Sequence, residues 1–460
     1  MAQRNKIIIF ICLIILTLTL YFSNNIQNNQ KININQNQNN NKVYEKHIQQ
    51  LRLQQKEQRE LKNFKDDMKS FPWDEYKESV ESGNRKLTDG YSQKLLYQLL
   101  PYLIAPPLQP INHTCKPEEI LLPLENITDQ YCKEYPNLFY GKRTTPIKVG
   151  HMIQFGFDVD TLEIHLNELY DIVDHFFIIE SAHTHYGGLK KPLIWEQVKY
   201  QDRFIRFQDK IIHFILDDAD QLRLAPKSTG KDSGDENIFG AEKYQESRRW
   251  DKFQEWNKLK GNLYQDTDII GFGDTDEVTT RRNIHMLKYC QLKETATSID
   301  IGIWFPYGIV TQAFRSDYPV DDNHPFTLGD PTFHTIKKAK SSKTYPNRNR
   351  GHSGQYMFGG MHMSRYGYIP FNIAKKLSCT ECGINKMEQL LVFSEDLING
   401  TIYELEKKLL KVPEHFELRV EKLSDMDQQF NKQVAILPWF LKCNPYRYPV
   451  WHMNHDTRLD

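Results

Sequence analysis

Residues 268–278 join a short apolar run to a cluster of acids. The run Ile269–Phe272 leads through Gly273 into Asp274, Asp276 and Glu277, which places three acids within four residues. An apolar run that stops so abruptly predicts a buried strand that ends in a loop. Two carboxylates one residue apart at such a point can both turn toward a hard divalent cation, which in turn binds phosphate oxygens. Asp274 and Asp276 are therefore candidate metal ligands.

Two simpler interpretations compete with a metal site. Short acidic motifs are often solvated loops, and acids at this place can cap the helix expected after Thr279. A calcium loop of the EF-hand type does not fit, because a further acid, a central glycine and a distal glutamate do not follow Asp276 in register.

The elements around this motif predict an α/β domain. Expected strands and helices alternate along the chain, with strands at 147–155, 173–181, 211–216, 268–274 and 299–305 and helices at 161–169, 240–261 and 279–289. Such alternation is typical of a mostly parallel central sheet. Ligands of these sheets bind beyond the carboxyl ends of the strands, where Glu180, Ser181 and Asp274 are placed. We expect these residues at a nucleotide site, although hydrogen bonding at a strand end would equally explain Glu180 and Ser181.

Composition argues against a nucleic-acid partner. The chain has 460 residues and a formal net charge of zero, so no overall field favours an anionic polymer. Arg248 and Arg249 on the helix before the acidic loop are candidates for phosphate contacts, with a solvated helix face as the simpler interpretation.

The N-terminus predicts a type II membrane protein. Residues 1–6 form a short basic tail, and residues 7–22 are an unbroken apolar run. As a helix this run spans about 24 Å, which suits the thinner membranes of the early secretory pathway. The positive flank places the tail in the cytosol. A cleaved signal peptide is the rival interpretation, but no small-x-small cleavage site follows Phe22.

The remaining chain divides by composition. Residues 23–69 are expected to be a stem. Residues 24–41 are almost wholly Asn and Gln, which predicts a flexible spacer, and the charged residues 42–69 are expected to form an exposed helix. Residues 70–145 form a lead-in region of undefined structure, and residues 146–460 are expected to be the lumenal catalytic domain. Sequons at Asn112, Asn126 and Asn399 agree with a lumenal location. Six cysteines beyond Cys12 allow up to three disulfides of open connectivity, and Cys379–Cys382 lacks the second ligand pair of a zinc site.

Several segments together resemble glycosyltransferase family 17, which includes the β-1,4-mannosyl-glycoprotein β-1,4-N-acetylglucosaminyltransferases that make bisected N-glycans. In chain order they are Phe157–Leu169, Val173–Ser181, Thr184–Gly187, Lys191–Leu193, Lys210–His213 with Asp217-Asp218, Gly273–Val278, Gly359–Ser364, Leu437-Pro438 and Asn444–Tyr448. The resemblance covers roughly residues 147 to 450. Met361 stands where the family usually has Trp, and Ser378–Cys382 is altered, so the resemblance bears more on the donor than on the acceptor.

The resemblance implies a GT-A-like nucleotide-sugar-binding fold, inversion at the anomeric carbon, and transfer from UDP-GlcNAc to a β-linked mannose of an N-glycan in the Golgi. The implied cofactor is a divalent metal ion, Mn²⁺ above all, held by Asp274 and Asp276, with Asp274 also near the donor ribose or phosphate. His362 is a candidate for binding metal or pyrophosphate, or else a packed or capping histidine.

An inverting transfer needs a general base, for which Glu277, Asp330 and Glu381 are candidates. Two other functions remain open. One is a glycosyltransferase of the same fold with another donor or acceptor. The other is a catalytically silent glycan-binding protein of the secretory pathway.

Overall fold

A computed structural model of the chain describes residues 64–117, 121–185, 189–216, 240–307, 309–316, 331–348, 355–364, 368–378, 418–422 and 435–453. All of them fall in one compact unit, residues 62–460. The predicted tail, the predicted anchor at 7–22 and most of the predicted stem lie outside these ranges. No helix within the described ranges is long and apolar enough to cross a membrane.

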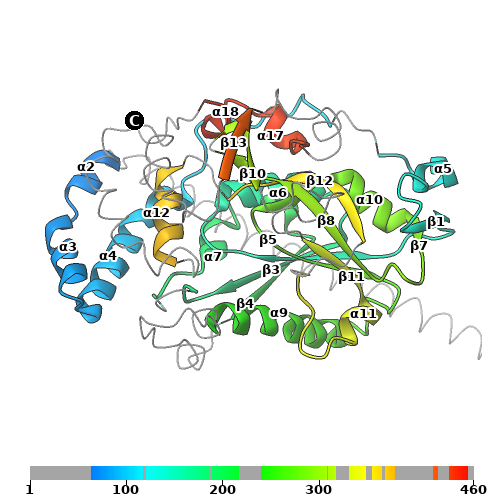
Figure 1. Cartoon of the computed structure of the whole chain (residues 1–460), viewed down its shortest axis with the longest axis horizontal. Coiled ribbons are helices and arrows are strands. Elements are labelled where there is room, and N and C mark those ends of the chain that lie inside the picture. The colour runs from blue at the N-terminus through cyan, green and yellow to red at the C-terminus, as the bar shows by residue number, and fades with distance from the viewer. Residues whose placement is uncertain are drawn as a thin grey trace, which may run out of the picture. The chain divides into compact units, whose positions relative to one another are not determined.

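An eight-stranded sheet forms the centre of the unit (Figure 1). In spatial order its strands are β4 (Ile211–Leu216), β3 (His175–Ser181), β2 (Val149–Gln154), β5 (Ile269–Asp274), β11 (Thr332–Thr335), β8 (Ser298–Trp304), β12 (Tyr356–His362) and β6 (Glu277–Thr279). The predicted α/β class is confirmed, and the five expected strands appear within two residues of their predicted bounds.

The sheet is mixed, which corrects the prediction of a mostly parallel sheet. β4, β3, β2 and β5 are parallel neighbours, and β8 is parallel to β12. β11 lies antiparallel between β5 and β8, and β6 lies antiparallel beside β12. The sequence does not predict β11, because Thr-Phe-His-Thr is too short and too polar to be recognised as a strand.

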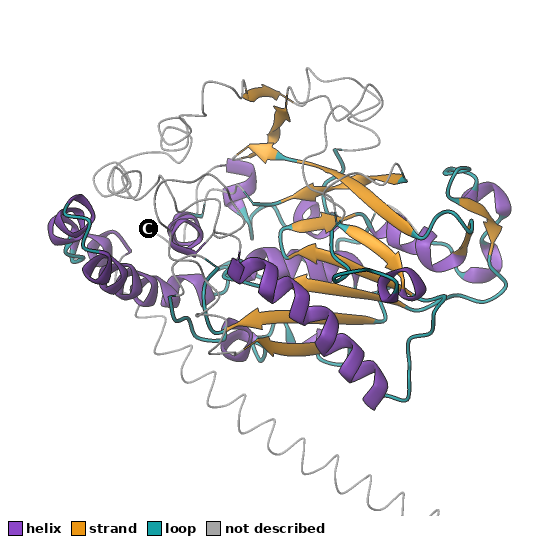
Figure 2. Ribbon diagram, turned by 60° about the horizontal axis from the view of Figure 1, so that its bottom comes forward, coloured by secondary structure: helices purple, strands orange, loops and turns teal. Residues whose placement is uncertain are grey.

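Side chains alternate between the two faces of the sheet along each strand, so they contribute to two hydrophobic cores, one on each face. Phe177 and Phe272 pack with Trp250 and Phe253 of α9 (Gly240–Leu259). Figure 2 shows α9 lying across this face of the sheet. α11 (Ile336–Lys340) adds Ile336 to the same core. The opposite face, with Phe176 and Ile178, packs against α6 (Val159–Leu169) and α10 (Arg281–Tyr289).

α6 is buried along its whole length, so its polar residues need partners inside the protein. Arg203 Nη1 donates to Asp160 Oδ1 at 2.7 Å and lies 3.3 Å from Glu163 Oε2. Arg447 Nη2 donates to Glu163 Oε1 at 2.7 Å. Glu168 accepts backbone N–H groups at the starts of two helices, α10 and α17 (Trp439–Cys443). The segments 157–169 and 444–448 are thus joined through the buried ion pair Arg447–Glu163.

Residues before 146 also contribute to the core. α2 (Phe64–Lys69), α3 (Trp73–Glu81) and α4 (Arg85–Ile104) share the core that contains α6, and α4 contacts α7 (Ile194–Val198) and α12 (Ile369–Ser378). The other described elements are α5 (Asp129–Cys132), β1 (Phe139–Lys142), β7 (Cys290–Leu292), β9 (Pro306–Tyr307), β10 (Ile309–Ser316), β13 (Leu418–Lys422), α18 (Pro449–Met453) and two short 3-10 helices at Leu124–Asn126 and Ile205–Phe207.

Two disulfides join distant parts of the chain, Cys115–Cys443 and Cys132–Cys290. Their presence agrees with an oxidising compartment. Asn112 and Asn126 of the predicted sequons are exposed. Asn399, Cys379 and Cys382 lie outside the described residues.

We expect the two disulfides to differ in their rate of reduction. Cys132 and Cys290 are both fully buried at 0 % exposure, whereas Cys115 and Cys443 are only half-buried. Because a thiolate must reach the sulfur it attacks, Cys115–Cys443 should open about tenfold faster or more. Timed alkylation and mass spectrometry under mild native reduction measure both rates. Equal rates would show that burial does not control access.

Candidate active site

The acidic loop follows β5 at the carboxyl edge of the parallel strands. Its backbone is hydrogen-bonded at Asp274, Thr275 and Asp276. The Asp274 N–H donates to Glu277 Oε2 at 3.0 Å. Thr275 donates through both its N–H and its hydroxyl to the Gln154 carbonyl at the end of β2. The Met363 N–H donates to the Asp276 carbonyl at 2.6 Å. The two aspartates therefore stand on a preorganised loop, as a binding site requires.

A buried histidine pair supports the loop from below. Burial lowers the pKa of His165 to about 4 and that of His151 well below its usual value, so both rings are neutral at pH 7. The Thr275 carbonyl can only accept, so His165 Nδ1 carries the proton and donates to it at 2.9 Å. His165 Nε2 must then accept from His151 Nδ1 at 3.3 Å. The pair fixes the peptide between Asp274 and Asp276.

The Asp276 carboxylate faces a lysine and a histidine side chain. Lys375 Nζ of α12 donates to Asp276 Oδ2 at 3.1 Å, and His362 Nε2 at the end of β12 lies 3.5 Å from Oδ1. Burial alone would raise the pKa of Asp276, but Lys375 and His362 outweigh it and hold the pKa well below its usual range. Asp276 is therefore ionised, and the structure brings it together with the predicted residue His362.

Asp274 and Glu277 share a different cation, Arg348. Arg348 Nη1 donates to Asp274 Oδ2 at 2.7 Å and to Glu277 Oε1 at 2.6 Å. Burial raises the pKa of Glu277 and Asp274 adds to the rise, although Arg348 opposes it. Arg348 lies 74 residues beyond Asp274, outside any motif, so sequence reasoning did not find it.

Glu180 and Ser181 make local contacts at the end of β3. Glu180 accepts from Lys191 Nζ at 2.8 Å and from the N–H groups of Ile194 and Trp195 at the start of α7. His213 Nε2 also lies 3.2 Å from its carboxylate. Ser181 Oγ accepts the His183 N–H. These contacts match the strand-end alternative for both residues.

The two arginine candidates on α9 contact other protein residues, and two of the acid candidates lie outside the described residues. Arg248 pairs with Asp251 on α9, and the fully buried Arg249 donates to Asn347 Oδ1. Asp330 and Glu381 lie outside the described residues.

The glycines before His362 serve the sheet. Gly360 has φ +143°, and a Cβ built there would lie 2.4 Å from the Val278 carbonyl oxygen. Its missing side chain thus permits close approach of β6 to β12, and this approach sets His362 opposite Glu277 in the register.

Asp158 is a site residue that the motif search did not single out. It is buried, and burial together with the nearby charge of Asp276 raises its pKa to about 7. The sequence could have pointed to Asp158, because it follows the strand β2 and so lies at the same sheet edge as the acidic loop.

Replacing Asp158 by Asn is expected to stabilise the protein at high pH. A carboxyl whose folded pKa is raised favours folding most below its unfolded pKa near 4 and loses that advantage as pH rises to about 7. In chelator at pH 8 the variant should gain about 2–4 kcal/mol in unfolding free energy, with little change at pH 4. Denaturant titrations at both pH values test this, with the exposed Asp251→Asn as control. A variant that is less stable than the wild type at pH 8 would refute the assignment.

Asp276 and His362 are the described residues that best fit a metal ion. They face each other from two chain segments and offer an oxygen and a nitrogen donor, a set that suits Mn²⁺. The described residues contain no preformed group of three or more His, Cys, Asp or Glu side chains for a metal. Remaining ligands would have to come from elsewhere, such as the phosphate oxygens of a bound ligand.

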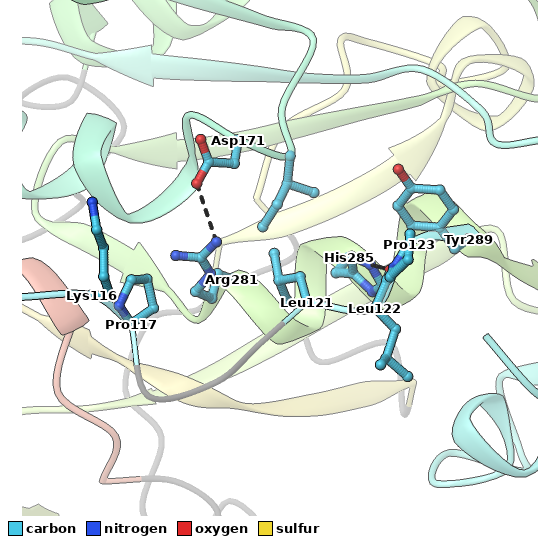
Figure 3. Close-up of a pocket in the computed structure, with 10 residues that line it drawn as sticks. Lys116, Pro117, Leu121, Leu122, Pro123, Asp171, Arg281, His285 and Tyr289 are labelled. Carbon is cyan, nitrogen blue, oxygen red and sulfur yellow. Dashed lines mark hydrogen bonds and ion pairs between the residues drawn. The ribbon is translucent and has the colours of Figure 1, made fainter. Parts of the chain in front are cut away.

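A separate pocket of about 470 Å³ lies against α10, on the α6 face of the sheet (Figure 3). Arg281 on its wall pairs with Asp171 at 3.2 Å, and His285 bonds the Leu122 carbonyl. The acidic loop does not line this pocket.

The comparison with known families found one match. An ordered acidic loop at the carboxyl edge of an α/β sheet lies inside a region that matches a glycosyltransferase domain. Residues 106–302 match the model of glycosyltransferase family 17, which confirms the predicted resemblance over that range. The predicted likenesses at 359–364 and 437–448 lie beyond the matched range. No curated protein and no solved structure matched the chain.

Proposed function

We propose that this protein is an inverting, metal-dependent glycosyltransferase that transfers N-acetylglucosamine from UDP-GlcNAc to a β-linked mannose of N-glycans in β-1,4 linkage. The observation that carries the proposal is the hydrogen-bonded loop 274–277, which lies inside the family match. Asp276 of this loop faces His362, which lies beyond the matched range. The likeness to the family implies the donor, the acceptor and the linkage.

Asp276 and His362 would hold the metal ion in this reaction. When bound, a divalent ion stabilises the negative charge that develops on the leaving diphosphate. Lys375 lies on the same carboxylate, so its ammonium group is placed to move from Asp276 to a phosphate oxygen when the donor binds. Asp274, held by Arg348, keeps an exposed side that can meet the donor ribose.

The general base is sought among four acids, Glu277, Asp330, Glu381 and Asp158. Glu277 accepts from both Arg348 and the Asp274 N–H, which supports a positioning role for it. Asp330 and Glu381 keep their predicted candidacy. Asp158 joins them, because a carboxylate with a pKa of about 7 can take a proton near neutral pH.

The proposal is tested by incubating the full chain with a panel of UDP-sugars, Mn²⁺ and N-glycan acceptors and by following UDP release. Chelator-sensitive transfer from UDP-GlcNAc to a mannose-bearing acceptor is the expected result. Transfer from another sugar nucleotide would keep the enzyme class and overturn the named product.

A catalytically silent glycan-binding protein is the second candidate. The pairing of Asp274 and Glu277 with Arg348 favours it, since these acids are already neutralised. Glycan binding without UDP release from any donor, by protein shown to be folded, would establish it.

We propose a Golgi or ER–Golgi location with a type II anchor at residues 7–22. The two disulfides and the exposed sequon residues Asn112 and Asn126 support a lumenal catalytic unit.

A further inference from the structure

We propose that Arg348 is the permanent counter-ion of the acidic loop. Its guanidinium group pairs with Asp274, Glu277 and Glu246, so that Asp276 and His362 are the pair that a divalent cation can bind. The part of the inference that concerns Asp276 rests on the proposed function. The part that concerns Arg348 stands on its own contacts.

Three carboxylates surround one guanidinium group. Nη1 donates to Asp274 and Glu277, and Nη2 lies 3.4 Å from Glu246 Oε1. The side chains of Glu277 and Glu246 are 1 % and 6 % exposed, and that of Arg348 is 11 % exposed. Little solvent screens Arg348, Glu277 and Glu246, so their attraction is strong and an unpaired member would be costly. The Asp274 side chain is 34 % exposed, so solvent screens its pairing more.

The backbone around Arg348 is anchored from two sides. Arg249 of α9 donates to the Asn347 side-chain oxygen. His334 of β11 donates through Nε2 to the Asn347 carbonyl at 2.8 Å. The residue before Arg348 is therefore tied to a helix and to a strand of the sheet, which fixes where the guanidinium enters the acid cluster.

The two halves of the acidic loop differ in how easily an external cation can reach them. Asp276 pairs with Lys375, whose side chain is 30 % exposed and donates one hydrogen bond to it. Displacing that single, hydrated ammonium is easier than displacing a guanidinium bound by three acids. Since Asp274 Oδ2 is already occupied, the loop should take up one cation at Asp276 and none at Asp274.

Removing the charge of Arg348 should open a second cation site. Asp274 Oδ2 and Glu277 Oε1 both lie within hydrogen-bond distance of the same nitrogen, so they converge on one point. Carboxylate oxygens that converge in this way are ligands for Mn²⁺. With a neutral residue at position 348, these two carboxylates should bind such an ion.

The experiment counts Mn²⁺ ions bound per full chain by electron paramagnetic resonance, with excess UDP present, and measures Tm with and without chelator. Neutral variants are Arg348→Met and Arg348→Gln, and Arg348→Lys keeps the charge. Arg248→Met is the matched control, because Arg248 pairs only with Asp251 among the described residues, on the exposed side of α9. Both neutral variants should bind one Mn²⁺ more than the wild type. Their Tm should fall by about 5 °C in chelator and recover with Mn²⁺.

The outcomes separate this inference from the proposed function. An unchanged Mn²⁺ count in Arg348→Met and Arg348→Gln, or an extra ion in Arg348→Lys or Arg248→Met, overturns the role of Arg348. A wild type that binds no Mn²⁺ while the neutral variants bind one supports Arg348 as counter-ion and overturns the metal in the proposed function. Should Arg348→Met fail to fold, Arg348→Gln keeps hydrogen-bond donors and supplies the count.

Discussion

Replacing Asp276 by Asn is expected to lower the rate of UDP-sugar turnover by about 10²–10³-fold or more while the protein stays folded. The substitution keeps the size of the side chain but removes the charge that faces Lys375 and His362. Because the folded state holds the pKa of Asp276 far below its usual range, the lost charge should also lower the Tm at pH 7. Initial rates of UDP release at saturating donor measure the effect, with circular dichroism as the check on folding.

Asp266→Asn is the control for this result. Asp266 is an exposed acid just before β5 that pairs with Lys340 on the surface. Its loss should leave both rate and stability nearly unchanged. A fully active Asp276→Asn would remove Asp276 from the metal site and, with it, the central assignment of the proposed mechanism.

The second large effect is expected in stability. Glu163→Ala should reduce the free energy of unfolding by about 3–5 kcal/mol. Glu163 is fully buried and accepts from Arg447 and Arg203, which are themselves buried. Its removal leaves the buried Arg447 without this carboxylate partner, and leaves Arg203 with one carboxylate fewer, Asp160 remaining.

Denaturant unfolding measures this loss, and two further variants make it specific. Glu81→Ala breaks an exposed pair with Lys77 and should change stability by about 0.5 kcal/mol or less. Joint replacement of Glu163 and Arg447 by Leu and Met should be less harmful than Glu163→Ala, since no unpaired charge remains at Arg447. A Glu163→Ala variant as stable as Glu81→Ala would show that the network does not stabilise the fold.

The parts of the fold that the sequence predicts are those with local hydrophobic patterns. The strand before Asp274 and the helix 159–169 are visible because apolar residues recur at strand or helix spacing. The acids at the ends of β3 and β5 are visible for the same reason. The sequence does not show that these acids have different partners. Glu180 accepts hydrogen bonds at the start of α7, whereas Asp276 faces α12.

The cations of the site arise from long-range packing. Lys375 lies 99 residues from Asp276, and Arg348 lies 71 residues from Glu277. Neither belongs to a motif of fixed spacing, so periodicity and propensity carry no information about these pairs. The four-residue strand β11, which breaks the parallel order, likewise forms because β5 and β8 offer it two edges at once.

The disulfide Cys115–Cys443 closes a loop of 328 residues that contains the whole acidic site. A protease that cuts the chain once anywhere within that loop releases no fragment, because both pieces stay covalently joined. A cut between Cys132 and Cys290 leaves them joined by two bonds. On a non-reducing gel such nicked protein runs as a single species, and only reduction reveals the cleavage. Purified material should therefore be judged for integrity after reduction, before its activity is compared between preparations.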